Sequence, residues 1–94
     1  MNVTSTIGER VFMSTWVWSK DAGYSSNALL LDLPNGHLVS VRKSGSRWIK
    51  AMIHNKVCYR TEAFKTQTLA LQSGHEEFVK QTIYQEAEKF NQGK

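Results

Sequence analysis

The chain has 94 residues, of which 40% are hydrophobic, 11% are aromatic and 21% are charged. This length suits one compact domain over residues 1–94, and the aromatic content excludes a disordered chain, which would carry fewer aromatic residues and more charge. Because Cys58 is the single cysteine, an intramolecular disulfide and a cysteine-based zinc cluster are excluded too.

Nothing in the sequence indicates export or membrane insertion. The first ten residues lack the apolar core of a signal peptide. The longest unbroken apolar run is Ala28 to Leu31, far short of the ~20 residues that a membrane span needs. A lone thiol also suits a reducing compartment. We therefore expect a soluble cytoplasmic protein with no membrane partner.

The N-terminal third predicts one strand between two irregular segments. Residues 1–9 are small and polar with no clear period, and we expect them to be loosely held. Residues 10–18 are rich in β-branched and aromatic side chains, which favours a strand. Residues 19–27 contain Gly23 and two further serines after Ser19, which is typical of a loop.

The middle of the chain predicts a four-stranded antiparallel meander. Turn residues occur at 33–37, 43–47 and 53–57, and three-residue loops there give strands near 28–33, 37–43, 47–53 and 57–60. Side chains alternate between the faces of a strand, so this register gathers odd-numbered positions on one apolar face: Leu29, Leu31, Leu33, Val39, Val41, Ile49, Ala51, Ile53, Val57 and Tyr59. A two-residue second loop would instead pair Val41 with Lys50 and break the agreement.

The C-terminal segment predicts a helix over residues 74–91. Residues 73–76 have the S-x-x-E spacing of a capping box, whereas residues 61–72 fit either a strand or the start of a helix. Val79, Ile83, Ala87 and Phe90 fall on one helical face, which we expect to pack on the odd-numbered face of the sheet. The predicted fold is therefore α+β: an antiparallel five- or six-stranded meander-type sheet, mainly within residues 10–72, with one C-terminal helix packed on one face.

Positive charge is concentrated in residues 42–65, which carry seven Lys and Arg residues against Glu62 alone. The predicted register puts Arg42 opposite Trp48 and Lys50 opposite Arg60, on the face away from the helix. Like charges opposite each other destabilise a sheet, and this favours a face that receives an anion. Lys43 and Arg47 flank the predicted Ser44-Gly45-Ser46 hairpin tip, whose backbone N–H groups and hydroxyls could add donors to phosphate oxygens. The predicted binding residues on this face and tip are Arg42, Lys43, Arg47, Trp48, Lys50, Lys56 and Arg60.

These residues predict a non-catalytic binding module that engages nucleic acid or a nucleoprotein complex. Cations would bind phosphates, which carry no base information, and Trp48 would stack or anchor. The same charges also fit a face that is simply solvated.

A face that mixes Trp, Met, Leu and Arg also suits a protein interface. The partner would be a second copy, or the chain would act as an adaptor or an inhibitor of a host defence complex, in the manner of phage and anti-CRISPR proteins.

Catalysis is the least favoured interpretation. The sequence has no phosphate loop, no dinucleotide fingerprint and no H-E-x-x-H motif, so we expect no cofactor, no metal and no enzymatic activity. One enzymatic alternative remains: a small metal-independent ribonuclease that uses His54, Lys56, Tyr59 and Arg60.

Overall fold

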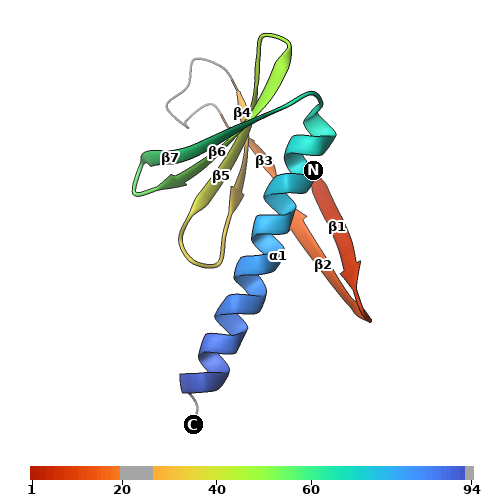
Figure 1. Ribbon diagram of the computed structural model, residues 1–94, viewed down its shortest axis with the longest axis vertical. Coiled ribbons are helices and arrows are strands. Elements are labelled where there is room, and N and C mark those ends of the chain that lie inside the picture. Colours follow the sequence, from red (N-terminus) through yellow and green to blue (C-terminus); the bar gives the residue numbers. More distant parts are fainter. Residues whose placement is uncertain (20–26, 93–94) are drawn as a thin grey trace.

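The computed structural model describes residues 1–19 and 27–92, and it has the predicted α+β architecture (Figure 1). Five antiparallel strands form one sheet in the order β3-β4-β5-β6-β7, and β1 and β2 form a separate two-stranded hairpin. One C-terminal helix, α1, packs against them. The elements are β1 Asn2–Ile7, β2 Arg10–Thr15, β3 Val17–Ser19, β4 Ala28–Asp32, β5 Leu38–Ser44, β6 Arg47–His54, β7 Val57–Phe64 and α1 Gln67–Gln92.

The N-terminal region differs from its prediction. Residues 2–7, expected to be loose, form β1 and pair with β2 along its whole length. The single strand predicted for residues 10–18 is divided at Trp16 into β2 and β3, which belong to different sheets. Of the loop predicted for residues 19–27, residues 20–26 lie outside the described part of the chain.

The predicted register is right for one hairpin and wrong for the next two. Leu31 lies opposite Val39, as expected. The β5–β6 loop has only two residues, because Gly45 with φ of 60° supplies the left-handed first position of a type II′ turn. Val41 therefore faces Lys50 and not Ile49, and this one-residue shift exchanges the two faces of β6.

The β6–β7 loop is also a two-residue turn. Asn55 and Lys56 have φ of 52° and 66°, as in a type I′ turn. An irregularity beside Met52 leaves Tyr59 without a direct partner and brings Thr61 opposite Ala51. The predicted contact between Ala51 and Tyr59 is therefore wrong.

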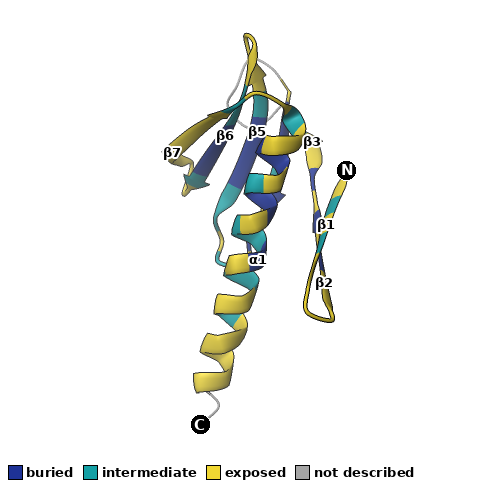
Figure 2. Cartoon of the chain, turned by 45° about the vertical axis from the view of Figure 1, so that its right-hand side comes forward, coloured by how far each residue is buried: buried dark blue, intermediate teal, exposed yellow. Residues whose placement is uncertain are grey.

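Helix α1 begins at Gln67, seven residues before the predicted start. The Thr66 hydroxyl accepts a hydrogen bond from the Leu69 amide at 3.2 Å and caps the helix, so the predicted capping box at residues 73–76 lies inside it. Its first half packs on the sheet, whereas Ile83 and Phe90 are 45% and 68% exposed (Figure 2). The prediction that Ile83 and Phe90 join the core is therefore wrong.

The core lies between α1 and the face of the sheet that it covers. Leu29, Leu31, Val39 and Val41 are buried there as predicted, and Met52 of β6 joins them. Burial of these side chains is the main source of stability in so small a domain.

Candidate functional site

The seven predicted binding residues do not form one surface. Arg42 lies opposite Ile49, on the face of the sheet away from Trp48 and Lys50. Lys56 sits in the turn at the other end of β6. The predicted face that joined Arg42 to Trp48, Lys50 and Arg60 is therefore wrong, because the β5–β6 loop is one residue shorter than assumed.

Two of the predicted cations already have acidic partners. Lys50 is 2% exposed, and its Nζ lies 3.1 Å from Glu62 Oε1 and donates to Ser73 Oγ at 2.8 Å. Arg60 Nη2 donates to Glu77 Oε1 at 2.8 Å. Because Lys50 faces Glu62 and not Arg60, the like-charge pair that favoured an anion does not exist.

Three of the predicted residues do come together, at the end of the β5–β6 hairpin. Lys43 lies directly opposite Trp48 on one face of the sheet, whereas Arg47, opposite Ser44, directs its side chain to the other face at the same end of the hairpin. Residues 43–47 are all exposed, while Trp48 is half-buried. We call Lys43, Arg47, Trp48 and the neighbouring Lys65 the basic tip; it lies at the top of Figure 1, where the hairpin extends from the sheet.

The aromatic part of the basic tip is anchored in the fold. Trp48 lies opposite Phe64 on β7, and both side chains pack partly against the core. Lys43, Trp48 and Phe64 thus form a row across three strands. A tryptophan held on one side by the core keeps its position and leaves its exposed surface for a ligand.

The electrostatic surroundings of the basic tip are positive. Lys65 follows Phe64, and α1 begins two residues later with no acidic residue in its first turn, so the positive end of the helix dipole is not neutralised there. Within the described part of the chain, the ion pairs involve Arg10, Lys50 and Arg60. Lys43, Arg47 and Lys65 therefore keep their charge available.

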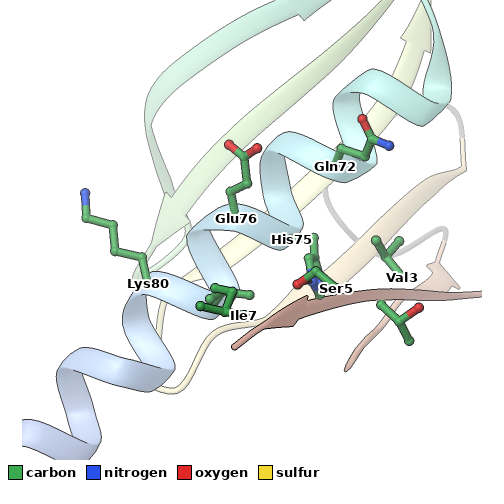
Figure 3. Close-up of a pocket in the computed structure, with 9 residues that line it drawn as sticks. Val3, Ser5, Ile7, Gln72, His75, Glu76 and Lys80 are labelled. Atoms are coloured by element: carbon green, nitrogen blue, oxygen red, sulfur yellow. Dashed lines mark hydrogen bonds between the residues drawn. The ribbon is translucent and has the colours of Figure 1, made fainter. Parts of the chain in front are cut away.

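A second candidate site is a groove of about 490 Å³ between β1 and α1 (Figure 3). His75 lies at its base and is 4% exposed. Its Nε2 is 2.8 Å from Ser5 Oγ, and its Nδ1 is 2.7 Å from Ser14 Oγ. The Trp16 indole donates to Ser14 Oγ at 3.1 Å.

The proton positions in this network can be assigned by counting donors. Ser14 is fully buried and already accepts the Trp16 N–H, and buried hydroxyl protons need an acceptor. The acceptor within reach is His75 Nδ1, so His75 carries its proton on Nε2 and donates it to Ser5. His75 therefore does not act as a base toward Ser5, and the network fastens the β1–β2 hairpin to α1.

Burial and this bonding both oppose a positive charge on His75. Desolvation lowers the pKa of His75, and the nearby Glu76 carboxylate opposes this effect. Protonation would also place a second donor against the Ser14 hydroxyl. The groove thus contains a neutral histidine with a structural role, which sequence reasoning missed because Ser5 is 70 residues away from it.

Two residues of the ribonuclease alternative, His54 and Tyr59, lie in one cluster through His37. The Nδ1 atom of His37 is 2.8 Å from the Tyr59 hydroxyl, and the rings of His37 and His54 stack with centroids 4.2 Å apart. The described residues include no group of three His, Cys, Asp or Glu side chains able to hold a metal ion.

Across residues 1–19 and 27–92, no helix has both the length and the apolar character that a bilayer crossing requires. Comparison of the chain with protein-family models, with curated proteins and with solved structures finds no match.

Proposed function

We propose that the protein is a small non-catalytic module that binds single-stranded nucleic acid through the basic tip. The observation that carries this proposal is the direct cross-strand placement of Lys43 beside Trp48, next to Arg47 and Lys65. Cations that are not neutralised, one of them directly beside an anchored aromatic ring and two at adjacent positions of the hairpin end, make the combination that nonspecific single-strand binding proteins use.

Each group has a distinct part in this mechanism. Lys43, Arg47 and Lys65 bind phosphate oxygens, with Arg47 able to do so through two parallel N–H donors. Trp48 stacks on an unpaired base, a contact worth ~1–3 kcal/mol. Bases within a duplex are already stacked on each other, so the single strand is the preferred ligand. Binding is weakly sequence-specific, because phosphate contacts carry no base information.

The test is a titration of labelled single-stranded DNA and RNA at increasing salt concentration. Three phosphate contacts give a slope of log affinity against log salt of about −2 on a single strand. Removing two of them in Lys43→Ala/Arg47→Ala should flatten the slope to about −0.7 and weaken binding severely.

The matched control is Lys80→Ala/Lys89→Ala, which removes the same charge from exposed positions on α1. It should bind like the wild type. Trp48→Leu should weaken binding while leaving the salt slope unchanged, because stacking releases no counterions. If the two double variants lost the same affinity, binding would depend on net charge alone, and the proposal would be contradicted.

A second candidate function, a protein-binding adaptor or inhibitor, is favoured by the other face of the sheet. Leu30, Leu38, Ile49 and Ile53 are half-buried on this face, and among the described residues α1 packs on the opposite one. Such a face suits a protein interface better than a solvated surface. If no nucleic acid binds at low salt, this face becomes the better candidate.

A further inference from the structure

Strand β7 is a long exposed edge of the five-stranded sheet. It spans Val57–Phe64, and every residue in it except Phe64 is exposed. The opposite edge, β3, spans three residues in the described part of the chain. Native proteins shield edge strands because their free N–H and C=O groups pair readily with another strand. On β7 the irregularity at Tyr59 interrupts one end, and residues 60–64 remain regular.

The hairpin geometry shows which backbone groups of β7 are free. Ser44 and Arg47 flank a two-residue loop and form a hydrogen-bonded pair. Such pairs alternate with non-hydrogen-bonded pairs along an antiparallel ladder, so Ile49 turns its backbone toward β5 and Lys50 turns its backbone toward β7. Lys50 bonds to Glu62, and Thr61 and Ala63 therefore direct their N–H and C=O groups to the free edge.

We propose that β7 pairs antiparallel with β7 of a second copy of this chain, about a two-fold axis at Thr61. Thr61 then faces its own copy as a hydrogen-bonded pair, with β-branched side chains side by side. Arg60 faces Glu62 of the second copy, and Glu62 faces Arg60. These two are non-hydrogen-bonded pairs, in which side chains approach most closely.

The charges on both sides of the new ladder alternate in sign. Glu62 stands between Lys50 of its own chain and Arg60 of the second copy. Its contacts to Lys50 and Arg60 within the chain both use Oε1, which leaves Oε2 for the second copy. Arg60 uses Nε and Nη2 within the chain, which leaves Nη1. The cross-chain pairs thus add to the existing ones without replacing them.

The same charges select this register against its two neighbours. A two-fold axis at Arg60 would oppose two arginines, and an axis at Glu62 would oppose two glutamates; both arrangements are destabilising. The axis at Thr61 instead gives two Arg60–Glu62 pairs between the chains, and this charge complementarity favours a second copy over an unrelated strand. The product is a ten-stranded sheet with both helices on one face and the two basic tips at opposite ends.

The experiment measures mass by light scattering over a concentration series for the wild type, Thr61→Pro and Thr61→Ala. Proline is tolerated on an edge strand where its position faces solvent, and it removes the N–H that the second copy needs. We expect the wild type and Thr61→Ala to dimerise and Thr61→Pro to remain a monomer. A wild type that stays monomeric, or a Thr61→Pro variant that still dimerises, overturns the proposal.

Amide exchange of the wild type tests the same interface without a substitution, which covers the case in which Thr61→Pro fails to fold. The Thr61 amide should exchange more slowly as protein concentration rises, while the Arg47 amide, which is bonded within the β5–β6 hairpin, does not change. Exchange at Thr61 that is fast at every concentration overturns the proposal. This inference does not depend on the basic tip, so either can fail alone.

Discussion

At position 74 the helix has no side chain, and the indole of Trp16 occupies the space that a Cβ would fill. A Cβ built there lies 2.5 Å from Trp16 Cη2, and Trp16 is 1% exposed. Gly is normally ~1 kcal/mol worse than Ala inside a helix. Here the close approach of the indole requires it.

Gly74→Ala should therefore destabilise the protein in spite of its better helix propensity. We expect the free energy of unfolding to fall by ~1–3 kcal/mol, the usual cost of overpacking a core, measured by urea denaturation. Glu88→Ala, on an exposed part of the same helix, should change it by less than ~0.5 kcal/mol. A Gly74→Ala variant more stable than the wild type would show that Trp16 is not wedged against α1.

Single residues also show what a sequence can and cannot reveal. Leu29, Leu31, Val39 and Val41 are buried as their alternation predicts. Lys50 is buried against expectation, because its location depends on Glu62 and Ser73, twelve and twenty-three residues away. Contacts between such distant residues can be predicted only after the pairing register of the strands is known.

The turns decide which face each strand presents. The Pro34–Gly36 turn gives its predicted pairing of Leu31 with Val39. The β5–β6 turn does carry a local signal, since Gly45 stands at the first central position that a type II′ turn requires. The β6–β7 turn has a weaker sequence signal, because Lys56 adopts φ of 66° although it is neither glycine nor asparagine. One wrong turn length was enough to separate Arg42 from Trp48 and Lys50 on opposite faces of the sheet.

Lys56→Gly should stabilise the β6–β7 hairpin. Asn-Gly is the preferred pair for a type I′ turn, and glycine adopts positive φ without a steric penalty. We expect the free energy of unfolding to rise by ~0.5–1 kcal/mol and the melting temperature to rise with it. Lys80→Gly, which removes the same charge within α1, should instead lower stability by ~1 kcal/mol. A loss of stability in Lys56→Gly would mean that the turn has another geometry.

The protein as a whole should lose stability in mild acid through His75, which joins β1 and β2 to α1. Burial lowers the pKa of His75 in the folded state, so the unfolded chain binds the extra proton more readily. The stabilisation is complete well above the unfolded value of about 6.5. It is lost progressively as the pH falls from there through the folded pKa.

This predicts a lower melting temperature at about pH 5 than at about pH 7.5. His75→Gln cannot take up the proton, so its melting temperature should be lower at neutral pH and should depend less on pH. The charged groups that line the same groove are Glu76 and Lys80, and of these the Glu76 carboxylate raises the pKa of His75. A wild type and a His75→Gln variant with equal pH dependence would contradict the assignment.

Trp16 is the single residue between β2 and β3, and it connects the β1–β2 hairpin to the five-stranded sheet. Its backbone exchanges hydrogen bonds with Met1 at 2.7 and 3.0 Å, and its indole lies in the core against α1. Lifting the β1–β2 hairpin away from the body would pull this indole into water. We therefore expect the hairpin to melt with the rest of the molecule in one cooperative transition, and not as an independent flap.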